Sequence, residues 1–155
     1  MFSIIIVIVA VSLVVALIAA TIYHGGDTLT DGRAQAGAIS LVNVGGQIAA
    51  ALYLREAQGI SLPANHTIPV SALGDSLRSA PPGWEVVCGE SVCRVAMPLQ
   101  ADQVEVCLTA NESAGLGRTF DLAVYDLVHA RYHCLERLDA RGATAGYQFS
   151  YLYRR

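Results

Sequence analysis

The fold depends first on the opening stretch "MFSIIIVIVAVSLVVALIAATI", residues 1–22, in which no side chain is charged and only Ser3, Ser12 and Thr21 are polar. The 19 residues from 4 to 22 would form a helix about 28 Å long, which matches the hydrocarbon core of a bilayer. Apolar side chains in such number do not stay in water. The stretch therefore predicts a helix that spans a membrane or packs among other apolar helices.

A cleavable signal peptide is the alternative for this stretch, because "ALIAA", residues 16–20, offers small residues for cleavage. The apolar run is longer than a usual signal-peptide core, however, and no Lys or Arg precedes it. Membrane anchors normally carry such bases on their cytoplasmic side. Their absence fits a chain from which a short basic leader has been removed directly before Met1.

The next segment, residues 28–59, has the period of an amphipathic helix. We expect a helix over 30–58, capped by Thr30 or Asp31 and followed by Gly59. A second membrane span is the alternative, since no charge lies between Arg33 and Arg55, although glycines and amide or hydroxyl side chains oppose insertion. The residues that recur at steps of four and three are Ala34, Ala38, Leu41, Gly45, Ile48 and Leu52.

Two glycines, Gly25 and Gly26, lie between the two helix-forming segments. Each costs about 1 kcal/mol relative to Ala inside a helix. We therefore expect non-helical backbone within residues 23–30; the alternative is one continuous helix bent at the glycines. The expected organisation is an N-terminal helix at 1–24 and a globular region at 25–155, formed by the helix at 30–58 and a sheet domain at 62–155.

Charge and length limit the kinds of function that this chain can have. Its 155 residues leave one domain of about 100 residues after the N-terminal segment. The 13 acidic residues outnumber 10 basic ones, all arginine, and no stretch gathers the bases into a stripe. Nucleic-acid binding is not expected.

The four cysteines, Cys88, Cys93, Cys107 and Cys134, suit two disulfides in an oxidising compartment. A zinc site is the alternative, but paired C-x-x-C units are missing. The C-x4-C spacing fits a hairpin closed by Cys88–Cys93, which leaves Cys107 to pair with Cys134.

The C-terminal region alternates as strands do. "GWEVVCGESVCRVAMPL", residues 83–99, reads as a hairpin, and "FDLAVYDLV" at 120–128, "RYHCLERL" at 131–138 and "YQFSYLYR" at 147–154 read as further strands. "ADQVEVCLTANESAGLG", residues 101–117, fits a helix capped by Asp102 and ended near Gly115 or Gly117, with a strand as the alternative. The expected fold class is α+β, with an antiparallel sheet packed on a long N-terminal helix.

Catalytic motifs are missing from the sequence, and we expect no catalytic, cofactor-binding or metal-binding residue. His129 and His133 would share one face of a strand without a carboxylate nearby, as solvent-facing residues. The pattern Asn111-Glu112-Ser113 matches an N-glycosylation acceptor but arises easily by chance. Core packing is the expected role of the aromatic stripe Tyr147, Phe149, Tyr151 and Tyr153.

The order of these segments resembles that of the type IV pilins and their pseudopilin relatives. Residues 31–59, "DGRAQAGAISLVNVGGQIAAALYLREAQG", are similar to the Ala/Gln/Gly-rich helix of some bacterial type IV pilins. "VEVCLTANESAGLG" at 104–117 and the ending "YHCLERLDARGATAGYQFSYLYRR" at 132–155 also carry the resemblance. In such pilins a C-terminal cysteine, here Cys134, precedes a Gly-containing turn, here 139–146, and a final aromatic strand, here 147–153.

The resemblance implies a structural subunit rather than an enzyme. Copies of the chain would be anchored in the inner membrane and then assembled by the pilus machinery into an extracellular helical filament that serves adhesion, motility, DNA uptake or conjugation. The alternative is a membrane-anchored periplasmic accessory protein, a minor pilin or a secretion-system pseudopilin. Pilins usually carry Glu at the fifth mature position, where this chain has Ile5, so that assembly role is not carried over. The expected filament-core residues are Ile4, Ile5, Ile8, Val11, Val15 and Ile18.

Overall fold

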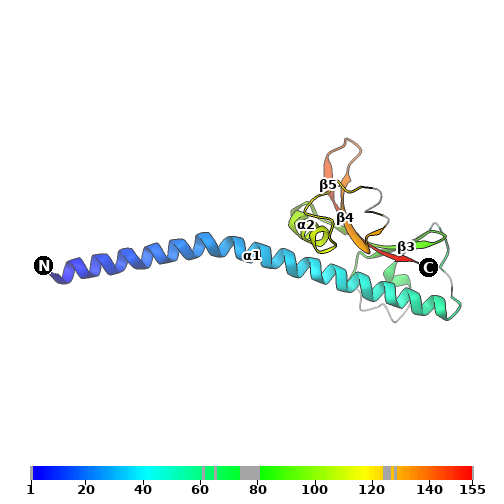
Figure 1. Cartoon of the computed structure of the whole chain (residues 1–155), viewed down its shortest axis with the longest axis horizontal. Coiled ribbons are helices and arrows are strands. Elements are labelled where there is room, and N and C mark those ends of the chain that lie inside the picture. The colour runs from blue at the N-terminus through cyan, green and yellow to red at the C-terminus, as the bar shows by residue number, and fades with distance from the viewer. Residues whose placement is uncertain are drawn as a thin grey trace. The chain divides into compact units, whose positions relative to one another are not determined.

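The computed structural model describes residues 2–60, 62–64, 66–73, 81–123, 127 and 129–154, with the backbone alone at 2–11, 17, 20–28 and 72. One long apolar helix and one antiparallel sheet with disulfides give the α+β class that the sequence predicts (Figure 1). The elements in chain order are the helix α1 (Phe2–Ala57), β1 (Thr67–Pro69), the 3-10 turn η1 (Val70–Ala72), β2 (Glu85–Cys88), β3 (Val92–Leu99), the 3-10 turn η3 (Ala101–Gln103), α2 (Val104–Ser113), β4 (Tyr132–Leu138) and β5 (Thr144–Arg154).

The helix α1 is unbroken from Phe2 to Ala57. The break expected at Gly25 and Gly26, and the helix start expected at residue 30 or 31, are therefore wrong for the single chain. Each glycine costs about 1 kcal/mol, whereas a break would unpair up to about four N–H and four C=O groups. The C-terminal end is as predicted, because Gly59 has a φ of 80° that a helix does not continue.

The chain divides into two compact units, Met1–Arg33 and Ala34–Arg155, whereas the sequence suggested a boundary between residues 24 and 25. The second unit contains the C-terminal part of α1 together with all of the sheet. Its core is continuous and includes residues from α1, α2 and the strands. The fold of this unit can therefore be followed from the residues of α1 outward.

Within the second unit, α1 turns one face to the sheet and α2. Ala34, Ala38, Ile48 and Leu52 are buried on this face, at most 5% exposed, in agreement with the predicted period. Glycines allow close approach: a Cβ at Gly37 would lie 3.0 Å from Val106 of α2. A Cβ at Gly45 would likewise lie 3.0 Å from Tyr151 of β5. The small residues of this helix thus serve packing on the domain.

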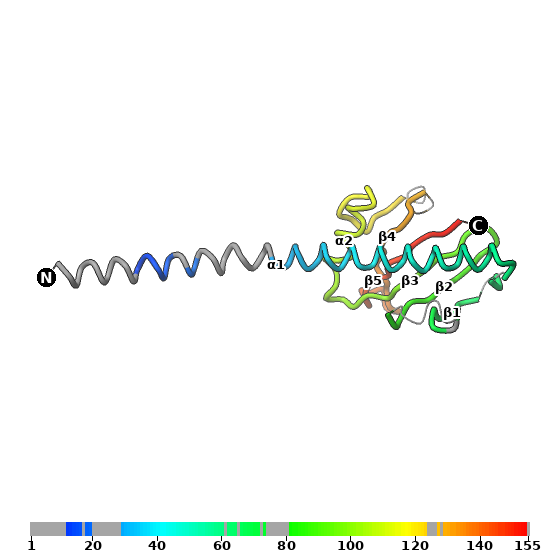
Figure 2. The backbone as a smooth tube through the Cα atoms, turned by 90° about the horizontal axis from the view of Figure 1, so that it is seen from below, coloured from blue at the N-terminus to red at the C-terminus, as the bar shows by residue number. Residues whose placement is uncertain are grey.

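The sheet has five antiparallel strands in the order β1-β2-β3-β5-β4, beside the C-terminal part of α1 in Figure 2. The hairpin predicted at 83–99 is present as β2 and β3, with Cys88 opposite Cys93. The strands predicted at 131–138 and 147–154 are present as β4 and β5, which pair with each other. The first strand, β1, adds an edge to β2 that the sequence pattern did not predict.

Two further predictions for this region need correction. Residues 120–123 are not in a strand, and residues 127 and 129 are helical; the other members of the predicted strand 120–128 lie outside the described residues. The predicted helix at 101–117 is present, but as η3 followed by α2. A capping box between Gln100 and Gln103 opens it instead of Asp102, because the amide of Gln103 reaches back to the Gln100 N–H at 2.9 Å.

The aromatic stripe of β5 packs as predicted. Phe149 is fully buried and Tyr147 is 8% exposed, while Tyr151 and Tyr153 are partly buried against the core. Phe149 meets Trp84 edge to face at 6.0 Å between ring centroids, a favourable geometry for aromatic pairs. This contact packs Trp84, which directly precedes β2, against β5.

Candidate assembly surface

The described part of α1 before residue 30 has an apolar surface on all its sides. Leu13, Val14, Val15 and Ile18 are each 54–60% exposed in the single chain. Successive helix positions are about 100° apart, so these four side chains span about 200° of the helix circumference. The exposed Ala16 and Ala19 lie in the remaining arc, so the apolar surface surrounds the helix. A helix that is hydrophobic all round is normally buried in a membrane or in a protein core.

Of the predicted filament-core residues, Val15 and Ile18 belong to this exposed surface. The side chains of Ile4, Ile5, Ile8 and Val11 lie outside the described residues, and only their helical backbone is given. We call the exposed apolar positions of this part of α1 the α1 collar: Leu13, Val14, Val15, Ala16, Ile18 and Ala19.

The outer face of α1 in the second unit is exposed and uncharged. Gln35, Ser40, Asn43 and Gln47 face away from the domain, together with the apolar Ile39. In the described part of the chain, Leu29–Ala57 is the one helical stretch long and apolar enough to cross a membrane. From residue 34 onward one face of this stretch is packed on the domain and contributes Ala38, Ile48 and Leu52 to its core.

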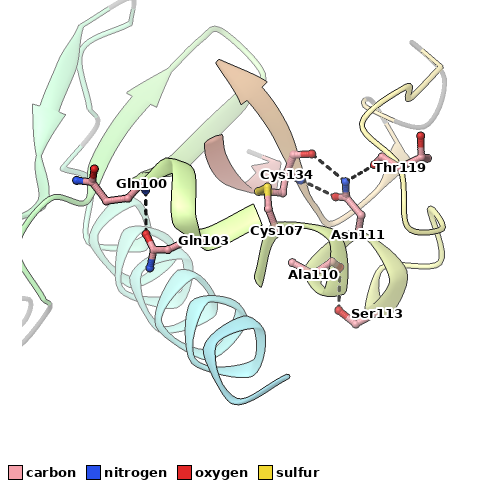
Figure 3. Close-up of a disulfide and its surroundings, with 8 residues drawn as sticks. All are labelled: Gln100, Gln103, Cys107, Ala110, Asn111, Ser113, Thr119 and Cys134. Atoms are coloured by element: carbon pink, nitrogen blue, oxygen red, sulfur yellow. Dashed lines mark hydrogen bonds between the residues drawn. A yellow bond between two sulfur atoms is a disulfide. The ribbon is translucent and has the colours of Figure 1, made fainter. Parts of the chain in front are cut away.

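Both disulfides predicted from the sequence are confirmed: Cys88 pairs with Cys93 and Cys107 pairs with Cys134. The first closes the β2–β3 hairpin. The second joins α2 to β4, which is the edge strand of the sheet, with 5.4 Å between the two Cα atoms (Figure 3). All four cysteines are at most 2% exposed. The sequence signal, an even cysteine count with one C-x4-C pair, was sufficient for this result.

Asn111, which the sequence suggested only as a chance glycosylation acceptor, protects the edge of β4 (Figure 3). Its Oδ1 accepts the Cys134 N–H at 2.7 Å, and its Nδ2 donates to the Cys134 carbonyl at 2.9 Å and to the Thr119 carbonyl at 2.7 Å. The side chain replaces the neighbouring strand that an edge residue lacks. Since Asn111 is 0% exposed, it does not accept a glycan in this fold.

A hollow of about 520 Å³ lies between α1 and the C-terminal end of β5; we call it the α1–β5 hollow. Its floor on α1 includes the small residues Gly46, Ala49 and Ala50, and Tyr53 and Tyr153 stand beside them. These two rings meet edge to face at 6.4 Å. Arg131 is exposed and also lines the hollow. Neither the hollow nor its charge was predicted, because residues 46–53 and 131–153 are far apart in the sequence.

Of the expectation that both histidines are solvent-facing residues of one strand, only the exposure of His129 is confirmed. His129 is exposed but precedes β4, whereas His133 lies within β4 and is 6% exposed, beside the buried Ser150 of β5. Arg94 and Pro98 on the same face of the sheet are exposed, so the burial is local to His133, Ser150 and Ala96, and alternation alone did not reveal it. Burial lowers the pKa of His133 below its ordinary 6.5, and the charge of Arg94 adds to this effect. Its buried Nδ1 has no hydrogen-bond partner among the described residues.

Among the residues that the structure describes, no group of three or more His, Cys, Asp or Glu side chains is placed to hold a metal ion. Comparison with protein-family models, with curated proteins and with solved structures finds no match to this chain. The functional argument therefore rests on the chemistry of the exposed surfaces, chiefly the α1 collar.

Proposed function

We propose that this chain is the structural subunit of a type IV pilus-like filament, in which the N-terminal helices of many copies bundle and the disulfide-bearing domains lie outside. The observation that carries the proposal is the α1 collar, an apolar helix surface exposed on all sides of α1. Lipid covers such a surface before assembly, and the same surface of other copies covers it afterwards.

The second unit supports the same proposal. Its two disulfides suit an oxidising compartment outside the cytoplasm. It packs on one face of α1 and leaves the outer face uncharged from residue 34 to residue 54. An uncharged helix face with small and amide side chains suits contact with another helix, because backbones approach closely and amides can pair with amides.

The test is electron microscopy and sedimentation of material sheared from cells that make the protein, or assembled from detergent. Val15→Asp in the α1 collar should abolish filaments, because a carboxylate within a dry helix bundle is strongly unfavourable. Leu138→Asp is the matched control, since Leu138 is equally exposed at 61% but lies at the end of β4; it should leave filaments unchanged.

Trp84, the single tryptophan, is buried in the second unit, so its fluorescence verifies that each variant remains folded. Normal filaments from Val15→Asp contradict the bundled arrangement. Wild-type protein that stays dispersed and never forms filaments contradicts the filament itself and favours the alternative, a membrane-anchored accessory protein or a minor subunit.

A further inference from the structure

The region of α1 that enters the proposed bundle has very little charge. Between residues 1 and 54 the charged residues are Asp27, Asp31 and Arg33. Asp31 is exposed and forms no ion pair with another described residue. Arg33 is two positions further on, and residues so spaced do not face each other on a helix. A helix bundle that excludes water therefore needs a positive group for Asp31 from elsewhere.

The α1–β5 hollow offers such a group beside a surface that a helix can approach. Its floor on α1 is formed by Gly46, Ala49 and Ala50, which have little or no side chain. Arg131 lines the same hollow and is exposed. Its backbone is fixed, because the Leu152 N–H of β5 donates to the Arg131 carbonyl at 2.8 Å. The backbone that carries this positive side chain is thus held beside the hollow at a defined position.

Other arginines with known contacts are already in use. Arg118 pairs with Glu105 at 2.5 Å and with Glu112 at 3.3 Å. Arg55 donates to the carbonyl of Leu73 at the C-terminal end of α1. Arg131 and Arg154 are both exposed and both line the α1–β5 hollow. Arg154 already has an interaction of its own, so Arg131 is the arginine assigned to the incoming carboxylate.

Resting on the proposed function, we infer that the α1–β5 hollow of one subunit receives the α1 turn of a second copy that carries Asp31, with Arg131 as the partner of its carboxylate. The small floor admits the incoming helix, and the opposite charges fix which part of that helix enters.

The first experiment exchanges the charges. Asp31→Arg alone and Arg131→Asp alone should each lower the sedimentable filament fraction by about tenfold or more, because like charges placed together are strongly unfavourable. The double variant should recover most of that loss. Glu90→Arg and Arg141→Asp, singly and together, change exposed charges in the β2–β3 and β4–β5 turns and serve as matched controls without effect. Filaments that tolerate both single changes overturn the inference.

The second experiment uses the absence of lysine from the sequence. Arg131→Lys keeps the charge and introduces the only side-chain amine, so a carbodiimide reagent can join it to a nearby carboxylate. In filaments mixed from isotope-labelled and unlabelled copies, mass spectrometry should find residue 131 linked to Asp31 of a different copy. Arg141→Lys is the control and should not give this product.

The outcomes separate this inference from the proposed function. Normal filaments in which residue 131 is linked to another acid, or to Asp31 of its own chain, overturn the inference and leave the filament proposal standing. A folded wild-type chain that forms no filaments overturns both.

Discussion

The N-terminal and C-terminal parts of α1 use similar apolar sequences in different ways. The α1 collar is exposed on every side in the single chain. From residue 34 onward, Ala34, Ala38, Ile48 and Leu52 are buried against the domain, while the outer face is uncharged and exposed. A segment of this chain can therefore form a helix whether or not the chain buries its side chains. One helix continues through both parts, but among the described side chains of α1 only those from residue 34 onward include buried ones.

The largest difference is expected between Leu52→Ala and Leu13→Ala. Leu52 is 0% exposed in the core, so its truncation should lower the free energy of unfolding of the domain by about 3 kcal/mol. Leu13→Ala, at a position 58% exposed, should leave that free energy unchanged. Urea unfolding of the full chain in detergent, followed by Trp84 fluorescence, measures both. Equal losses of unfolding free energy in the two variants would mean that both parts of α1 contribute alike to the stability of the domain.

The next effect concerns the hydrogen bonds by which the Asn111 side chain joins α2 to β4. Asn111→Ala removes three hydrogen bonds and leaves the N–H and C=O of the buried Cys134 without them. The free energy of unfolding of the domain should fall by about 2 to 3 kcal/mol. Ser113→Ala on the same helix is the control and should change little, because the exposed Ser113 hydroxyl donates to the Ala110 carbonyl and accepts from the Tyr132 hydroxyl at 3.3 Å in an exposed contact, where water can replace it. If the urea midpoint of Asn111→Ala equals that of the wild type, the Cys107–Cys134 disulfide alone is sufficient to keep β4 attached to α2.

One glycine from each part of α1 gives a smaller and opposite pair of effects. Gly45→Ala should destabilise the domain by about 1 kcal/mol, since its Cβ would lie 3.0 Å from Tyr151 and overpacking exceeds the gain in helix propensity. Gly32→Ala meets nothing within 4 Å and should stabilise the helix locally. Amide hydrogen exchange around residue 32 should slow by about fivefold. Stabilisation by both substitutions would contradict the close approach of α1 to β5.

The smallest effect should be a loss of stability of the second unit at acidic pH. The pKa of His133 is lowered in the folded domain, so the unfolded chain takes up its proton first as the pH falls. The domain should keep its full stability above the ordinary pKa of 6.5 and lose part of it below. His133→Gln should weaken this loss, and the exposed His129→Gln should keep it. Chemical unfolding at several pH values measures the difference; an identical acid response in both variants would remove the role of His133.

Patterns that depend on near neighbours were sufficient for much of the fold. Apolar content predicted helix at the N-terminus, the four-and-three spacing predicted the buried face of α1, and alternation predicted β2, β3, β4 and β5. The C-x4-C spacing and an even cysteine count predicted both disulfides. Each of these signals reports on which side of an element is apolar or which residues a short turn joins, and both properties are local.

Only the tertiary structure decided the features that depend on distant residues. Alternation could not show that His133 is buried, that Asn111 replaces a missing strand, or that Gly45 meets Tyr151. Helix continuity through Gly25 and Gly26 follows from the cooperative loss of backbone hydrogen bonds that a break would cause, which a sum of residue propensities does not contain. By itself the sequence determined that this chain has more apolar helix than its own domain can cover. The tertiary structure decided which of those side chains remain exposed, because burial is set by what folds back against each face.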